Sequence, residues 1–279
     1  MIGRLFALGI EGLRRRFGLA MLVWGANLAV ALAISVPAIT ALNSIVGPSG
    51  FGDDLARSFD LVLWSDILDR TSLDGLLHFV WIIPTYMIWK SLLAAGLLHA
   101  LAGSGTGSFV QGIRRFWARS LAIGLVFLPV AVLGVVGAVL SGVLLSAVWT
   151  GEVARFWIGV VVIPTLIFCI LAAVILLRDV ARGVLVVQEQ PVWTAVAAGF
   201  MRPFQRGAIA AVYGAWLLVT ASTIALWPVV EMHVAQSAVT LFLSLQALLF
   251  CRAAATVAWH ASLAAVCDEP SVPHVGEGN

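Results

Sequence analysis

Six long apolar stretches without any Asp or Glu constrain the fold of this chain more than any other feature. Each is long enough to cross the hydrocarbon core of a bilayer, which takes a helix of about 20 apolar residues. Within lipid, only helices and closed barrels satisfy their own backbone hydrogen bonds. The sequence therefore predicts an all-α, polytopic membrane protein with six transmembrane helices. The six predicted spans cover residues 17–41, 76–101, 120–148, 156–177, 207–230 and 237–265.

The composition excludes the other broad classes of protein. Hydrophobic residues make up 61% of the 279 residues and charged residues 11%, whereas a soluble domain carries about 25% charged residues. Disorder is excluded as well, because it requires low hydrophobicity and high charge. The eleven Trp residues fit a chain that meets the lipid interface repeatedly.

The arginines give the orientation of the spans, because basic residues that flank spans collect on the cytoplasmic side. With both termini inside, eleven arginines flank the spans on the cytoplasmic face and three on the outer face. We therefore predict a multi-pass protein of the bacterial cytoplasmic (inner) membrane with both termini in the cytoplasm. Seven inner arginines are expected to contact anionic lipid headgroups rather than nucleic acid. They are Arg14, Arg15, Arg16, Arg114, Arg115, Arg202 and Arg206.

The domain organisation is simple. One integral membrane domain covers residues 1–267, and a short cytoplasmic tail follows at residues 268–279. The longest connection is an external loop, residues 46–75, in which apolar residues recur at helical spacing among acidic ones. An amphipathic helix on the outer membrane surface explains this loop best, and a lid over a cavity is the alternative.

Three similar phrases precede the first, third and fifth spans, and each joins a glycine to nearby arginine and phenylalanine residues. A short amphipathic stretch accompanies each phrase. The pattern predicts three hairpins, each entered through a short interfacial amphipathic helix. The alternative is that basic and aromatic residues gather independently wherever a span enters from the cytoplasm. The phrases and their stretches occupy residues 12–17 with 5–10, 112–116 with 109–113, and 199–204 with 192–200.

These phrases also carry a resemblance to known proteins, together with Arg178-Asp179-Val180-Ala181-Arg182 and the following segment 184–189. The chain resembles a loose group of bacterial six-span inner-membrane proteins without assigned activity. That group is similar to the membrane region that precedes some glycerophosphodiester phosphodiesterases. The resemblance implies six spans over most of the chain. It implies no catalytic residue, because the sequence contains no phosphodiesterase domain.

Lys90 and Arg252 are costly features, because each lies near the middle of a predicted span. Both would lie roughly 15 Å from either interface, which is farther than their side chains reach. A charge there costs about 2.5–3.5 kcal/mol and requires a partner or water. Neutral groups that could serve as partners are Gln246, Asn27 and Tyr86.

Three explanations of these two cations remain open at this stage. In the first, the span boundaries differ, or backbone carbonyls and water satisfy both charges. In the second, an anionic solute or a lipid headgroup binds between the second and sixth helices. In the third, another membrane subunit or a second copy of the chain supplies an acidic residue.

The remaining motifs favour packing over chemistry. Gly134, Ala138 and Gly142 stand at i+4 spacing in the third span, which is typical of close helix packing. The five histidines and three cysteines are scattered without ligand spacing, and no known catalytic motif occurs. We therefore expect no catalytic residue, no metal and no cofactor.

Two functions are compatible with these features. The first is a membrane-embedded binding or accessory subunit, without catalytic machinery, that holds a partner protein or lipid through its intramembrane polar groups. The alternative is a transporter of an anionic solute or lipid that uses Lys90 and Arg252. An enzyme ranks third, since no set of acid, base, nucleophile or metal ligand can be assembled.

Overall fold

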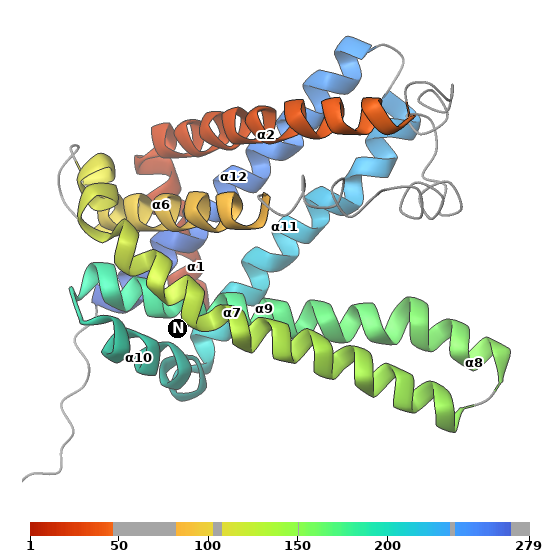
Figure 1. Cartoon of the computed structure of the whole chain (residues 1–279). Coiled ribbons are helices and arrows are strands. Elements are labelled where there is room, and N and C mark those ends of the chain that lie inside the picture. Colours follow the sequence, from red (N-terminus) through yellow and green to blue (C-terminus); the bar gives the residue numbers. More distant parts are fainter. Residues whose placement is uncertain (47–81, 103–107, 150, 235–237, 269–279) are drawn as a thin grey trace, which may run out of the picture. The chain divides into compact units, whose positions relative to one another are not determined.

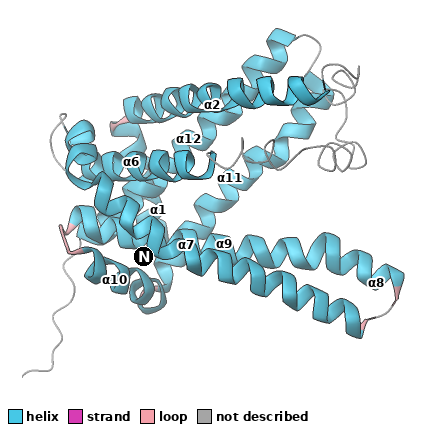
Figure 2. Cartoon of the chain, in the orientation of Figure 1, coloured by secondary structure: helices cyan, strands magenta, loops and turns pink. Residues whose placement is uncertain are grey.

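The structure is a computed structural model that describes residues 1–46, 82–102, 108–149, 151–234 and 238–268. In these ranges the secondary structure is helical and contains no strand (Figure 2). This agrees with the predicted all-α fold. The amphipathic helix expected in the external loop lies outside the described residues, and so does almost all of the predicted tail.

Ten helical elements make up the described chain (Figure 1). Two of them, α8 and the π-helical turn η2, lead directly into α9, so that these three form one continuous path. The elements are α1 (Ile2–Arg15), α2 (Phe17–Val46), α6 (Ile82–Ala102), α7 (Ser108–Val148), α8 (Glu152–Trp157), η2 (Ile158–Val162), α9 (Ile163–Val187), α10 (Val192–Gln205), α11 (Gly207–Val234) and α12 (Ala238–Asp268).

Four described helical segments are long and apolar enough to cross a membrane. A fifth is possible if α1 and the start of α2, which are bent by 79° to each other, are counted as one span. The chain is thus a multi-pass membrane protein, whereas the count of six spans stays a prediction. The four segments are Ser108–Val148, Glu152–Val187, Gly207–Val230 and Val239–Asp268.

The chain divides into two compact units. The small unit is Leu22–Lys90, and the main unit joins Met1–Met21 to Ser91–Asn279. In the small unit, α2 and α6 are linked by a hydrogen bond of 2.9 Å, which Trp89 Nε1 donates to Asn27 Oδ1. The prediction of one membrane domain over residues 1–267 is neither supported nor excluded by this division.

The hydrophobic core of the main unit lies at the helix ends that the sequence assigns to the cytoplasmic side. We call this region the base. The other halves of α7, α9, α11 and α12 leave most of their large apolar side chains exposed. Burial therefore changes along each of these helices, rather than only around it. The base consists of α1 and α10 with residues 91–102 of α6, 108–127 of α7, 174–187 of α9, 207–216 of α11 and 253–267 of α12.

Within the base, three helices pack on a neighbouring helix through a glycine, and the geometry of the three contacts is the same. A Cβ on Gly9 of α1 would meet the Ala258 carbonyl oxygen and the Ser262 side chain of α12. In each contact, the glycine faces the carbonyl oxygen of one residue of the partner helix and the side chain of the residue four positions later. Small residues at these points let the helix backbones approach closely. The two corresponding sets are Gly112 with Ala95 and His99, and Gly199 with Leu177 and Ala181.

These contacts refine the predicted repeat. In the first copy the equivalent glycine is Gly9, one turn before Gly12, although Gly12 also lies against Ala261. Helices α1 and α10 are both followed by an arginine with non-helical backbone, Arg16 (φ −127°, ψ 43°) and Arg206 (φ −124°, ψ 77°), directly before the next helix. Two of the three copies therefore share a short helix and a sharp break.

The second copy departs from the prediction, because residues 109–113 do not form a separate interfacial helix. They are the first turns of α7, which continues without a break to Val148. The buried residues Ser108, Gly112, Phe116 and Ser120 recur every fourth position. This stripe packs on the base as one helical face, so nothing in the segment favours a break.

Candidate functional site

Two charged residues of α9 lie inside the base. Asp179 is 7% exposed and Arg182 is 3% exposed, and they stand three residues apart, so that both side chains lie on one face of the helix. Asp179 Oδ1 lies 3.9 Å from Arg182 Nη1. Charges so deeply buried are stable only when they are paired and hydrogen-bonded.

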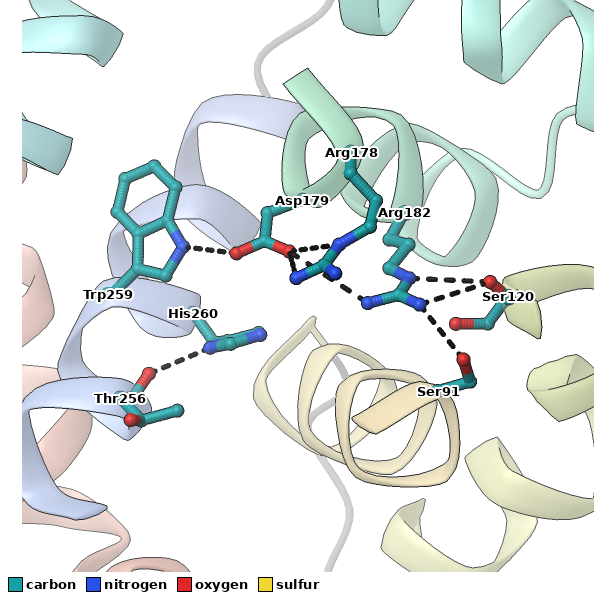
Figure 3. A network of polar contacts seen from close by, with 8 residues as sticks. All are labelled: Ser91, Ser120, Arg178, Asp179, Arg182, Thr256, Trp259 and His260. Atoms are coloured by element: carbon teal, nitrogen blue, oxygen red, sulfur yellow. Dashed lines mark hydrogen bonds and ion pairs between the residues drawn. The ribbon is translucent and has the colours of Figure 1, made fainter. Parts of the chain in front are cut away.

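Asp179 uses both carboxylate oxygens (Figure 3). Oδ1 accepts weak hydrogen bonds from Arg178 Nε at 3.4 Å and Arg178 Nη2 at 3.3 Å. Oδ2 accepts a hydrogen bond of 3.2 Å from Trp259 Nε1 of α12. The Trp259 ring in turn packs edge-on against Tyr213 of α11, with centroids 5.0 Å apart. The carboxylate thus connects α9 to α12, and Trp259 extends the connection to α11.

Arg182 extends the network to two other helices. Its Nη2 donates a hydrogen bond of 2.9 Å to Ser91 Oγ of α6. Nη2 and Nε also donate to the Ser120 carbonyl oxygen of α7, at 3.3 and 3.4 Å. The rigid fork of the guanidinium suits several acceptors in a plane. Arg182 therefore holds α6 and α7 against α9.

His260 of α12 lies beside this network, and its Nδ1 is 2.8 Å from the Thr256 carbonyl oxygen (Figure 3). The network contains two guanidinium groups and one carboxylate. Arg178 is the outermost of the three, with a side chain that is 26% exposed. We call Arg178, Asp179, Arg182, Ser91, Ser120 and Trp259 the charge network.

The sequence pattern does not predict the charge network, although Arg178, Asp179 and Arg182 belong to a segment that carries the resemblance. The available signal was an Asp two residues beyond a predicted span with an Arg three residues later. Asp179 follows the predicted span 156–177, so the sequence pattern gives it no place among the intramembrane charges.

Several of the seven arginines predicted at the lipid interface pair with other side chains. Arg115 Nη2 lies 2.6 Å from Glu189 Oε2, and Arg15 Nε lies 2.6 Å from Glu11 Oε1. Arg202 Nη2 donates to Gln188 Oε1 at 2.8 Å, and Gln188 Nε2 donates to the Cys267 carbonyl oxygen at 2.6 Å. Arg14 and Arg114 are exposed on the surface.

Lys90 is half-buried in the small unit. Its Nζ lies 5.4 Å from the centroid of the Tyr86 ring, a cation–π contact. The indole of the neighbouring Trp89 donates a hydrogen bond to Asn27 Oδ1, so this oxygen accepts from an indole rather than from the Lys90 ammonium. Within the part of the chain that is described, Lys90 has no acidic partner.

Arg252 belongs to the main unit and is exposed on α12. Its carbonyl oxygen accepts a hydrogen bond of 2.9 Å from Thr256 Oγ1. No described residue offers an acceptor to its guanidinium. Gln246, one of the proposed partners, has a buried Oε1 that lacks a hydrogen-bond donor among the described residues.

The small residues of the third span lie where α7 meets α9. Ala138 is 4% exposed. A Cβ on Gly134 would lie 2.5 Å from Ile170 Cγ2, and a Cβ on Gly142 would overlap the Ile163 side chain. By contrast, a Cβ on Gly137 would meet nothing within 4 Å.

No group of three His, Cys, Asp or Glu residues in the described ranges could hold a metal ion. Comparison with known protein families, with curated proteins and with solved structures finds no match for this chain. Function is therefore inferred from the geometry of the charge network, of the exposed spans and of the two cations.

Proposed function

We propose that this protein is a membrane-embedded accessory subunit that binds another membrane protein through its spans and catalyses no reaction. One observation carries the proposal. Each of the four candidate spans has a most apolar stretch, and in these stretches only 11% to 22% of the residues are buried within the protein. In a bilayer, lipid or the helices of a partner cover the remaining apolar surface, and helix contacts with a partner rely on such packing.

The charge network supports the same function. Its charges pair with one another and with donors and acceptors of the protein, rather than lining an open polar pathway. A network that joins α6, α7, α9 and α12 makes the base a fixed anchor from which the exposed halves of the spans extend. Such an anchor suits a protein that positions a partner.

The proposal includes the topology derived from the sequence. It consists of six spans in three hairpins, in the bacterial inner membrane, with both termini in the cytoplasm. The matching dockings of Gly9, Gly112 and Gly199 favour three related units. The base contains the helix ends near which the inner arginines gather, as expected for the cytoplasmic side.

Photo-crosslinking from the α7 surface tests the accessory function. Leu133 and Leu144 are 71% and 69% exposed, so a crosslinking residue at either position should capture a discrete protein in native membranes. The matched control is Ile170, which faces Gly134 and should give only products within the chain. Exclusive capture of lipid at Leu133 and Leu144 would contradict the accessory function.

Transport of an anionic solute or lipid is the second candidate, favoured by two cations that lack an acidic partner among the described residues. The test replaces Lys90 and Arg252 with Met, singly and together, and measures anion flux in proteoliposomes. We expect no flux from the wild-type chain. Flux that disappears in the double variant, while assembly is normal, would establish transport and reject the accessory function.

A further inference from the structure

Helices α11 and α12 form an open groove with a volume of about 280 Å³. Its walls are almost entirely apolar. Arg252 is the charged residue among those that line it. The rest of the lining is formed by Thr223, Ile224, Trp227 and Pro228 of α11 and by Leu248 and Leu249 of α12.

The position of Arg252 along α12 gives the groove a direction. Arg252 is exposed, and the stretch that follows it, residues 253–267, belongs to the base. Leu248 and Leu249 lie one turn further from the base, on the exposed half of the helix. The groove therefore has its cation at the end nearest the base and extends along the apolar half of the hairpin.

The charge of Arg252 has to be compensated by an anion or by water from outside the described residues. Its guanidinium has no acceptor among the described residues. A cation beside apolar walls in a membrane helix is costly unless an anion or water reaches it. A guanidinium binds phosphate through two parallel hydrogen bonds, which makes a phosphate the best complement.

We propose that this groove binds an anionic phospholipid, with the phosphate at Arg252 and an acyl chain along Ile224, Trp227, Leu248 and Leu249. The apolar walls suit the chain, since each buried methylene contributes about 0.8 kcal/mol. Free phosphate would use only the cation and leave these walls uncovered. The inference depends on α11 and α12 spanning the membrane, with Arg252 nearer the inner interface than the middle of the predicted span 237–265, where a lipid phosphate can reach it. It adds a lipid site to the proposed accessory function.

Native mass spectrometry of the delipidated full chain tests the site, with phosphatidylglycerol or phosphatidylcholine added back. The wild-type chain should retain phosphatidylglycerol in preference to phosphatidylcholine. Arg252→Met should lower the retained phosphatidylglycerol about fivefold, which corresponds to about 1 kcal/mol for one basic group. Arg252→Lys keeps the charge but not the two parallel hydrogen bonds, so it should retain an intermediate amount. Arg155→Met, at an exposed arginine on α8, is the matched control and should behave as wild type.

The apolar part of the site has its own pair of variants. Ile224→Trp fills the groove and should lower retention with Arg252 still present. Leu226→Trp places the same side chain at a residue that is 47% exposed and outside the groove, and it should not change retention.

Three results would overturn the lipid site. They are equal retention of the two lipids, unchanged retention in Arg252→Met, and displacement of phosphatidylglycerol by inorganic phosphate alone. Crosslinking at Leu133 and Leu144 lies on the other hairpin. It therefore tests the accessory function independently of whether the groove binds lipid.

Discussion

Trp259 Nε1 of α12 donates a hydrogen bond of 3.2 Å to Asp179 Oδ2 of α9. The two residues are 80 positions apart in the chain. The bond orients the carboxylate so that its other oxygen faces Arg178 and Arg182. A single indole thus fixes the geometry of the buried charges in the base.

Asp179→Asn should destabilise the protein strongly. The substitution keeps the shape of the side chain but removes the negative charge, which leaves Arg182 as an uncompensated buried cation. Loss of one partner of a buried ion pair costs about 3–5 kcal/mol. Denaturant unfolding of the detergent-solubilised protein measures the loss.

Glu189→Gln is the matched control for that experiment. Glu189 also pairs with an arginine, but the side chains of Arg115 and Glu189 are 58% and 49% exposed. A surface pair contributes about 0–1 kcal/mol. If Asp179→Asn lowers the free energy of unfolding by no more than a surface pair contributes, as in Glu189→Gln, the buried network does not stabilise the base.

Gly9→Ala should weaken the docking of α1 on α12. The new Cβ would lie 2.7 Å from the Ala258 carbonyl oxygen, a backbone atom that cannot move aside. Overpacking of this kind costs about 1–3 kcal/mol. Thermal unfolding monitored by circular dichroism measures it. Gly3→Ala on the same helix meets nothing within 4 Å and should be neutral or stabilising.

The same substitution at Gly112 and Gly199 tests whether the three dockings are equivalent. A Cβ added at either glycine would lie 2.7 Å from a backbone carbonyl oxygen, that of Ala95 or of Leu177. Losses similar to that of Gly9→Ala are expected. A loss at only one of the three positions would argue against a common docking unit.

Gly142→Leu should separate α7 from α9, because the side chain would occupy the space of Ile163. Gly137→Leu lies on the open face of α7 and should be tolerated. A cysteine crosslink introduced between the two helices reports their contact. Similar crosslinking in the two variants would contradict close packing through Gly142.

The proposed orientation is tested by labelling with a membrane-impermeant maleimide. The three native cysteines, Cys169, Cys251 and Cys267, are first replaced by alanine. Glu152→Cys, at the first residue of α8, should be labelled in intact cells. Gly3→Cys should be labelled only after the membrane is opened. The reverse pattern would invert the topology.

The sequence was informative about membrane insertion, because insertion depends on local composition. The stretch 207–230 was predicted within a few residues of α11, whereas 120–148 ends with α7 but begins well after its first residue, Ser108. The short helices at 5–10 and 192–200 were expected, because their amphipathic pattern is local too. Residues 109–113 carried a similar pattern, yet the structure continues them into α7, since packing on the base outweighs the interfacial preference.

The candidate sites were harder to predict, because pairing between charges depends on how helices rotate and cross. Arg182 and Asp179 are neighbours on one helix, but Ser91, Ser120 and Trp259 come from three other helices. Those crossings include close glycine contacts, such as Gly183 of α9 against Leu263 and Cys267 of α12, which composition does not reveal.

The sequence by itself determined that this is a multi-pass helical membrane protein, and it singled out Lys90 and Arg252 as charges in need of a partner. Only the tertiary structure decided which charges are satisfied. Asp179 and Arg182 are enclosed and paired in the base, whereas Arg252 lines an apolar groove. The physical reason is that the cost of a charge in a membrane depends on its local segment, while its compensation depends on atoms brought from distant parts of the chain.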